Sequence, residues 1–150
     1  MIGLLQRVSS ARVAVAGETI GEIGRGLLVL VGVQRDDTPA QAARLLERLL
    51  AYRVFPDDQG RMNLDLRQIS GGLLLVPQFT LAADTRRGNR PGFSRAAAPE
   101  HGAALFDTLV RLAQDSWQQV SSGQFGADMQ VALVNDGPVT FWLEVPPTGD

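Results

Sequence analysis

The sequence predicts an α+β domain with a mainly antiparallel sheet and helices packed on one side of it. Two observations support this prediction. Short apolar segments bounded by glycine, proline, asparagine and aspartate recur along the chain, which is typical of strands. Two longer segments instead repeat their apolar residues at the spacing of one helix face. Because 150 residues suffice for one domain with its own core, we expect a single domain over residues 1–150.

The first third of the chain predicts three strands, over residues 2–8, 11–16 and 27–33. Glycines at positions 17, 21, 24 and 26 mark turns between the second strand and the third. Every residue of the third segment except Gly32 is a leucine or a valine. We therefore expect this strand to be buried on both faces of the sheet.

A helix is predicted to follow and to end near Tyr52. Thr38 is a suitable N-cap, Pro39 suits the first helical position, and Gln41 stands where a capping box has glutamine. One stripe recurs at helical spacing, made of Ala42, Leu45, Leu46, Leu49 and Leu50. The stripe indicates the face that is buried.

The middle of the chain predicts loops around one strand. Residues 55–60 predict a turn with solvated charges, because the alternating oxygen ligands of a calcium-binding loop are missing. Residues 73–76 predict a buried strand that Pro77 ends, since proline cannot donate to a central ladder. Residues 84–94 are rich in turn formers and arginine, so they predict a surface loop.

The last third predicts a second helix, over residues 99–117, and two final strands, over residues 129–134 and 139–145. The helix has a broad apolar face of the kind that packs on a sheet, made of Leu105, Phe106, Leu109, Val110, Leu112 and Ala113. Between the two strands lies Asn135-Asp136-Gly137-Pro138, in which Asp-Gly suggests a hairpin turn.

Composition excludes most familiar catalytic centres. There is no cysteine and His101 is the only histidine, so we expect no disulfide, no thiolate nucleophile and no cysteine-ligated metal. We predict that the protein uses no metal and no cofactor. A Ser-His-Asp triad could use only His101, which stands at a predicted helix start, usually an exposed place. The formal net charge of -2 argues against a protein that covers long stretches of nucleic acid, but it allows binding of one RNA end.

The hydropathy pattern predicts a soluble cytoplasmic protein with no membrane partner. The first residues lack the basic start, apolar run and cleavage site of a secretory signal, and no apolar run reaches about 18 residues.

Two short segments are candidates for chemistry. Pro77-Gln78-Phe79-Thr80-Leu81 is either a strand end followed by a turn, or a place where main-chain N–H groups of Gln78 and Phe79, released from the ladder, stabilise an oxyanion. In Asn135-Asp136-Gly137-Pro138-Val139-Thr140, proline directly after Asp-Gly is unusual, because it removes a donor at the start of the returning strand. Sequence alone leaves the isomer of the Gly137-Pro138 bond open.

These two segments resemble the motifs of the D-aminoacyl-tRNA deacylases, which pair Ser-Gln-Phe-Thr with Asn-x-Gly-Pro-Val-Thr. Further similar blocks run in order along nearly the whole chain, among them Gln6-Arg7-Val8, Tyr52-Arg53-Val54-Phe55, Leu81-Ala82-Ala83-Asp84-Thr85 and Arg90-Pro91-Gly92-Phe93-Ser94. Either motif alone would be weak, but both together with these blocks are hard to obtain by chance.

The resemblance implies a homodimeric editing enzyme that hydrolyses the ester of D-aminoacyl-tRNA, and of glycyl-tRNA mischarged on tRNA for alanine, while rejecting L-aminoacyl-tRNA. It assigns the catalytic site to Gln78, Phe79 and Thr80, where main-chain contacts and the 2′-hydroxyl of the substrate replace a side-chain base. In the family, the Gly-Pro motif of one subunit enters the site of the other in cis form and crowds the place of an L side chain. The resemblance therefore assigns the chiral filter to Gly137 and Pro138.

One residue departs from the family pattern. Pro77 stands where the family usually has serine. If that hydroxyl were the nucleophile, this protein would be inactive, but the family is understood not to use it so, and we expect activity. Proline also restricts the backbone of the preceding residue, Val76, so its effect falls on the geometry of the loop.

Several alternatives stay open at this point. Thr80 could act as a nucleophile, although no base lies near it in sequence. Arg86, Arg87 and Arg90 either contact phosphates near the acceptor end or form a solvated basic loop. The chain could also be a non-catalytic module that captures an RNA end, which Pro77 keeps open, or a structural dimerisation domain.

Overall fold

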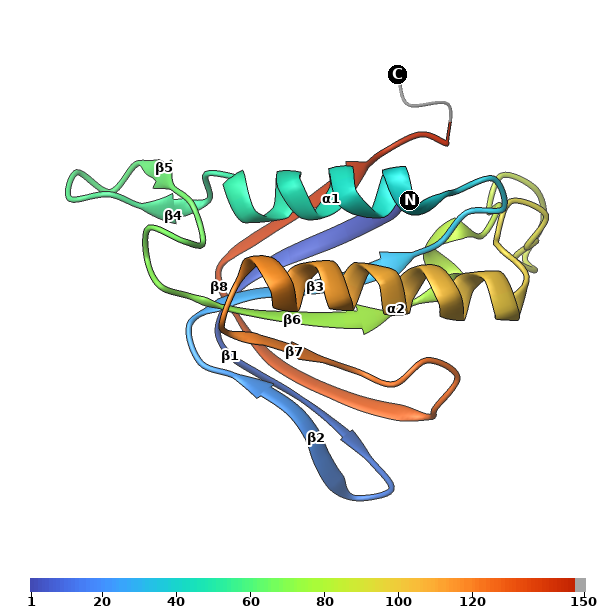
Figure 1. Cartoon of the computed structure of the whole chain (residues 1–150), viewed down its shortest axis with the longest axis horizontal. Helices are drawn as coiled ribbons and strands as arrows, with labels where there is room; N and C mark the ends of the chain where they lie inside the picture. The colour runs from blue at the N-terminus through green and yellow to red at the C-terminus, as the bar shows by residue number, and fades with distance from the viewer. Residues whose placement is uncertain (148–150) are drawn as a thin grey trace.

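The computed structural model describes residues 1–147, and Figure 1 shows how its helices and strands are arranged. The elements in chain order are β1 (Ile2–Val15), β2 (Glu18–Ile23), β3 (Gly26–Gly32), α1 (Pro39–Ala51), β4 (Phe55–Pro56), β5 (Met62–Leu64), β6 (Gly72–Pro77), the 3₁₀ helix η1 (Phe79–Ala82), α2 (Pro99–Ser116), β7 (Val120–Ser122) and β8 (Met129–Glu144).

A mixed sheet has the strand order β2-β1-β3-β6-β7, and β8 pairs with β1. Strand β1 is antiparallel to β2, β3 and β8, whereas β3–β6 and β6–β7 are parallel pairs. The parallel pairs arise because α1 and α2 each lie in a crossover that carries the chain back to the same end of the sheet. The predicted α+β class with a mainly antiparallel sheet is confirmed.

Two pairs of predicted strands are each one long strand. Residues 2–8 and 11–16 fall on β1, whose first half pairs with β3 and whose second half pairs with β2. Residues 129–134 and 139–145 fall on β8, and both halves run antiparallel to β1. The predicted hairpin at residues 135–138 is therefore wrong. Each of the two strands has exposed polar residues where its pairing is irregular. In the sequence such residues look like a turn, so each strand was predicted as two.

Two strands of the sheet were not predicted. β2 buries only Gly21 and Ile23, so it lacks the apolar alternation that identifies a strand, and its glycine suggested a turn. β7 has three half-buried residues and is too short to give a periodic signal.

Helices α1 and α2 lie side by side over one face of the sheet, as predicted (Figure 1). The predicted stripe of α1 is buried, together with Gln41, whose side-chain oxygen accepts the Thr38 N–H at 2.8 Å. In α2 the predicted face is buried except for Leu112, which is partly buried. Neither helix, over the described part of the chain, has the length and hydrophobicity needed to cross a membrane.

The sheet has an apolar cluster on each face. Leu27, Val29 and Val31 of β3 belong to the cluster under the helices, whereas Leu28 belongs to the second cluster. The second cluster lies where β2 approaches β6, and its buried members are Val8, Ala11, Val13, Ile23, Leu28, Leu74 and Val76. β3 is thus buried on both faces, as predicted, and it gives a rigid base to the groups at its two ends.

Candidate functional site

The first candidate segment lies where the parallel strands β3 and β6 end. The Gln78 N–H donates to the Val31 carbonyl at 2.8 Å, which extends the pairing of the two strands by one residue before η1 begins. η1 packs closely on Gly32, because a Cβ added to Gly32 would lie 2.9 Å from the Cβ of Leu81. Glycine at position 32 therefore allows η1 to lie against the strand end.

The main-chain donors at this place differ from the prediction by one residue. The expectation that the Gln78 N–H is released from the ladder is wrong, because this group serves Val31. Phe79 and Thr80 are exposed, and their N–H groups have no acceptor within residues 1–147. Two consecutive N–H groups of this kind can stabilise a developing oxyanion. The available donors are those of Phe79 and Thr80.

Side chains surround these donors with polar and aromatic groups. The Gln78 side-chain amide donates to the Thr80 hydroxyl. The rings of Phe79 and Phe93 are 5.2 Å apart between centroids, and the two residues are 57% and 41% exposed. Two large aromatic side chains in contact at the surface form an apolar patch of the kind that marks a binding surface.

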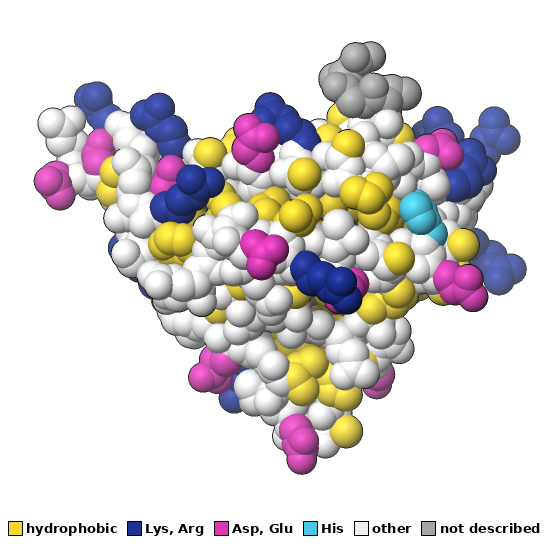
Figure 2. Space-filling view, viewed as in Figure 1, with side chains coloured by type: hydrophobic (Ala, Val, Ile, Leu, Met, Phe, Trp, Pro, Cys, Tyr) yellow, Lys and Arg dark blue, Asp and Glu magenta, His cyan; other side chains and the backbone are white. Residues whose placement is uncertain are grey.

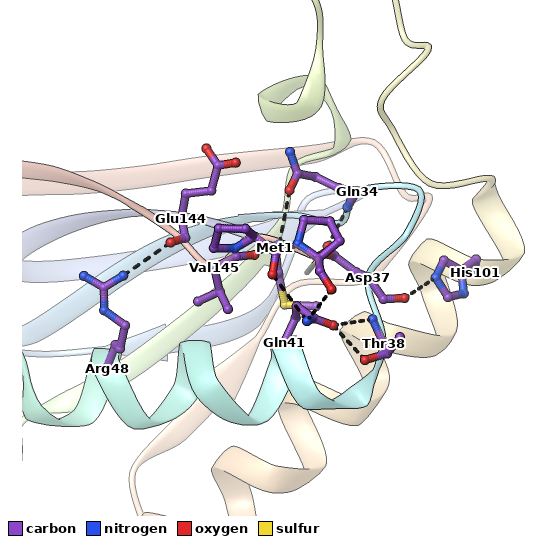
Figure 3. A network of polar contacts seen from close by, with 11 residues as sticks. Met1, Gln34, Asp37, Thr38, Gln41, Arg48, His101, Glu144 and Val145 are labelled. Atoms are coloured by element: carbon purple, nitrogen blue, oxygen red, sulfur yellow. Dashed lines mark hydrogen bonds and ion pairs between the residues drawn. The ribbon is translucent and has the colours of Figure 1, made fainter. Parts of the chain in front are cut away.

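His101 is engaged in the structure away from any triad. It lies in the first turn of α2 and is half-buried rather than exposed. Its Nε2 is 2.7 Å from the main-chain oxygen of Asp37 (Figure 3). A carbonyl oxygen can only accept, so this nitrogen carries the proton and donates it. His101 therefore joins α2 to the start of α1 and offers no free base at Nε2.

The second candidate segment is a bulge in β8. Val8 pairs with Asn135 and Gln6 pairs with Thr140, so residues 136–139 lie opposite Arg7 alone. The side chain of Asn135 closes the base of the bulge: its Oδ1 accepts the Val139 N–H at 2.9 Å, and its Nδ2 donates to the Thr140 hydroxyl at 2.8 Å. The polar residues of the motif thus fix the path of the main chain.

Arg7 holds the bulge from the neighbouring strand. Its Nε donates to the Asp136 carbonyl at 3.0 Å, and its Nη1 donates to the Val54 carbonyl at 2.7 Å. Gly137 has φ +138°, and a Cβ there would lie 3.1 Å from Arg7 Nη2, so this position requires glycine. Gly137 and Pro138 are exposed, and the peptide bond between them is cis.

The two candidate segments lie near opposite ends of β3. Arg7, which holds the bulge, pairs with Leu27, whereas η1 packs on Gly32. The strand between Leu27 and Gly32 is about 17 Å long at the usual rise per residue. In Figure 1, η1 follows the arrowhead of β6, at the end of the sheet where α1 and α2 begin. One chain therefore does not bring η1 and the bulge together.

Arginines gather over the loop of residues 84–95, at the right edge of the view in Figure 2. Asp84 and Gly92 close the base of this loop with two main-chain hydrogen bonds, of 2.7 and 3.0 Å. The Asp84 carboxylate also accepts two hydrogen bonds from the Arg86 guanidinium, at 2.9 and 2.8 Å, which hold the pKa of Asp84 well below its usual value. Arg87 and Arg90 form no ion pair with any of residues 1–147.

A family model described as D-Tyr-tRNA(Tyr) deacylase matches residues 4–144. The chain belongs to this family. Relatives named D-aminoacyl-tRNA deacylase are similar over nearly their whole length. That of Alkalilimnicola ehrlichii is 65% identical over 148 residues, covering 99% of each chain. That of Thioalkalivibrio sulfidiphilus is 67% identical over 147 residues, covering 98% of this chain and 99% of the relative.

Two solved structures are similar in fold to this chain of the D-Tyr-tRNA(Tyr) deacylase family. The c-Myc DNA Unwinding Element Binding Protein superposes with a TM-score of 0.93 at 36% identity, covering 97% of this chain and 99% of that one. A probable eukaryotic D-amino acid tRNA deacylase superposes with a TM-score of 0.82 at 20% identity, covering 95% and 97%, and supports the fold alone. The predicted family is confirmed, and the named relatives are hydrolases of the aminoacyl-tRNA ester.

Several residues of the candidate site were not predicted from sequence. Arg7 and Gly32 lie far from both motifs along the chain, and only strand pairing brings them to the bulge and to η1. Phe93 meets Phe79 because the loop of residues 84–92 closes on itself. Asn135 belongs to a motif that the sequence identified, but its two side-chain hydrogen bonds depend on the bulge.

Proposed function

We propose that the chain is a homodimeric D-aminoacyl-tRNA deacylase that hydrolyses the ester to free tRNA and a D-amino acid. The observation that carries the proposal is that two consecutive exposed residues, Phe79 and Thr80, have N–H groups without an acceptor among the described residues, in a chain of this family. An aminoacyl ester is already reactive, so a site that holds it and stabilises charge on its carbonyl oxygen can promote attack by water.

The reaction needs no strong side-chain base. Water adds to the ester carbonyl carbon, and the negative charge that develops on the oxygen is stabilised by the two N–H groups. The bond between the carbonyl carbon and the ribose oxygen then breaks, and the leaving oxygen takes up a proton. We propose that the neighbouring 2′-hydroxyl of the substrate assists these proton transfers, as the family resemblance implies. Gln78 and Thr80 support the loop through their mutual hydrogen bond.

Pro77 is compatible with this mechanism. It pairs with Val31 at the end of β6, and the donors belong to the second and third residues after it. A mechanism that uses main-chain groups at Phe79 and Thr80 loses no donor when residue 77 lacks a hydroxyl and an N–H.

We further propose that a second copy of the chain completes the site with its Gly137-Pro138 bulge. The bulge is anchored at its base but exposed at its tip, and it lies far from η1 of its own chain. Exposed apolar side chains lie near both segments. Val134 and Trp142, one on each side of the bulge along β8, are 57% and 51% exposed, and Phe79 and Phe93 form the patch beside the donors. Burial of such surfaces favours association.

The filter follows from this arrangement. Main-chain atoms of the bulge would occupy the position of an L side chain whatever its identity, whereas D residues place their side chain elsewhere. A misfit of about 4 kcal/mol gives roughly thousand-fold discrimination. Glycine has no side chain and passes the filter, so we propose glycyl-tRNA, notably glycine mischarged on tRNA for alanine, as a second substrate.

The purified chain should release the amino acid from D-tyrosyl-tRNA and from glycyl-tRNA while leaving L-tyrosyl-tRNA intact. Release of labelled amino acid measures each rate. If both substrates survive while a control esterase cleaves them, the proposed activity is lost. Binding of a non-hydrolysable D-aminoacyl-adenosine analogue without any ester turnover would instead identify a binding module, and failure to bind it would favour a structural dimerisation domain.

The substitution Thr80→Val should retain most of kcat, because valine keeps the main-chain N–H and loses only the hydroxyl. Single-turnover hydrolysis of D-tyrosyl-tRNA measures the rate. A loss of about a thousandfold or more would identify Thr80 as the nucleophile, because removal of a nucleophile costs far more than loss of a supporting hydrogen bond.

The substitution Pro138→Ala should weaken rejection of L-aminoacyl-tRNA and lower the ratio of kcat/KM for D over L substrate by up to about a thousandfold. Rates on D- and L-tyrosyl-tRNA give the ratio. Mixing Gly137→Val chains with Gly32→Val chains should restore selectivity. In a mixed dimer, one of the two sites combines the intact η1 of the Gly137→Val chain with the intact bulge of the Gly32→Val chain. Unchanged selectivity in Pro138→Ala, or a fully selective monomer, would exclude the filter.

Arg87 and Arg90 are proposed to contact phosphates near the acceptor end, whereas Arg86 is engaged by Asp84. Arg87→Gln should therefore weaken tRNA binding and lower its salt dependence by about one charge, as loss of one phosphate contact does. Arg86→Gln is the matched variant and should mainly speed hydrogen exchange at the Gly92 amide. Equal salt slopes for wild type and Arg87→Gln would indicate a solvated loop.

A further inference from the structure

Arg35 and Arg95 face each other across a short antiparallel contact. The bridge between Gln34 and Ala96 sets the register of this contact. Residues 35 and 95 are the next opposed pair, and the Arg35 N–H donates to the Arg95 carbonyl at 2.9 Å. Opposed residues of an antiparallel pair project their side chains to the same face, with Cβ atoms about 5 Å apart. Two arginine side chains therefore leave one face of this contact side by side.

The juxtaposition is electrostatically unfavourable. Both arginines are exposed, and neither forms an ion pair with another residue of the described chain. Asp36 and Glu144 line the same hollow of about 230 Å³, but neither carboxylate is within ion-pair distance of Arg35 or Arg95. Directly opposed like charges destabilise an antiparallel pair. Natural proteins keep such arrangements mainly at functional sites, so the pair points to an anionic ligand.

The main chain around the two arginines is held in place. Directly before the first arginine, the Gln34 N–H donates to Asp37 Oδ2 at 2.7 Å. Figure 3 shows that His101 of α2 binds the main chain of the same aspartate. Two residues after the second arginine, the Ala97 N–H donates to the Val33 carbonyl at 3.0 Å. The positions from which the two side chains start are thus fixed before any ligand binds, which lowers the entropy cost of binding.

The pair lies close to the exposed donors of η1. Phe93 contacts Phe79, whose N–H is one of the donors, and Arg95 comes two residues after Phe93. Arg35 comes three residues after Gly32, on which η1 packs. Two and three extended residues span at most about 7 and 11 Å. The last nucleotides of an RNA whose end is held at η1 can therefore reach both arginines.

We propose that Arg35 and Arg95 together bind the phosphodiester that joins the last two nucleotides of the tRNA acceptor end. This assignment rests on the deacylase function proposed above. It places a phosphate contact at the base of the loop of residues 84–95, separate from the contacts proposed for Arg87 and Arg90.

A phosphodiester fits the chemistry of the hollow. It carries one negative charge and two oxygens outside the ester linkages, and a guanidinium can donate to such oxygens through parallel N–H groups. Two arginines can therefore share one phosphate. The carboxylates of Asp36 and Glu144 lie in the same hollow and disfavour an anion of higher charge, such as a phosphate monoester.

Two dinucleotide substrates test the contact. The D-tyrosyl ester of cytidylyl-adenosine has one phosphodiester, and its methylphosphonate analogue is neutral at the same position. Wild type should have a KM for the phosphodiester at least about fivefold lower than for the analogue, with similar kcat, because the contact holds the substrate equally in the ground state and the transition state. Equal KM values for the two substrates would overturn the proposal.

Variants assign the preference to the pair. Arg35→Gln and Arg95→Gln should each remove most of the preference for the phosphodiester, and the double variant should lose little more, because one phosphate is shared. Arg44→Gln is the matched control, since it removes an exposed arginine of α1 that pairs with Glu47, and it should keep the preference. A wild-type preference in the double variant would exclude the pair as the phosphate site.

Stability measurements separate loss of the contact from loss of the fold. At low salt each single variant should unfold at the same or a higher urea concentration than wild type, because one of two facing like charges is gone. A preference that falls only in step with stability would count against the contact.

Binding separates this proposal from the proposed activity. If wild type hydrolyses neither dinucleotide ester, the deacylase function fails, and binding of tRNA without an amino acid then decides the phosphate site. The double variant should bind this tRNA more weakly, with a salt slope smaller by about 0.7, as expected for one phosphate of a single strand. Equal affinities and slopes for wild type and the double variant would overturn the site.

Discussion

The parallel pairing of β3 with β6 determines where the candidate donors lie. The two strands stay in register from Gly26 and Gly72 to the bond between Gln78 and Val31. They approach so closely at the first pair that a Cβ on Gly26 would lie 1.9 Å from the Gly72 carbonyl oxygen. The ladder uses the Gln78 N–H. The N–H groups of the next two residues, Phe79 and Thr80, therefore come directly after the end of the ladder and have no acceptor among the described residues. A shift of one residue in this register would present a different pair of donors.

Side chains at both candidate segments act mainly on the backbone. Asn135 and Arg7 bind main-chain groups of the bulge, and the glycine at position 32 allows η1 to approach β3. A substrate that varies in its side chain is suited to recognition by main-chain atoms, which do not depend on that variation. The family motifs are accordingly rich in residues that fix a backbone path, namely glycine, proline, asparagine and threonine.

Local signals in the sequence predicted the elements whose structure depends on residues close together in the chain. The capping residues and the apolar stripe identified α1 with its start at Pro39, and continuous apolar runs identified β3 and β6. The bulge in β8 was taken for a hairpin, because Asp-Gly favours a turn and the pairing of both flanks with β1 is a long-range property. The choice between Gln78 and Thr80 as donor likewise depends on Val31, which is 47 residues before Gln78 in the chain.

The separation of η1 from the bulge distinguishes two requirements of an editing enzyme. The proposed hydrolysis uses the N–H groups of Phe79 and Thr80 as donors, and one chain presents both of them. The proposed discrimination between D and L residues relies on a steric wall facing those donors, and the bulge of the same chain lies near the other end of β3. Without such a wall the donors would serve any aminoacyl ester, including the L-aminoacyl-tRNA that translation consumes. In the proposed assembly the wall comes from a second chain, so selectivity depends on association, whereas the donors are present in each chain by itself.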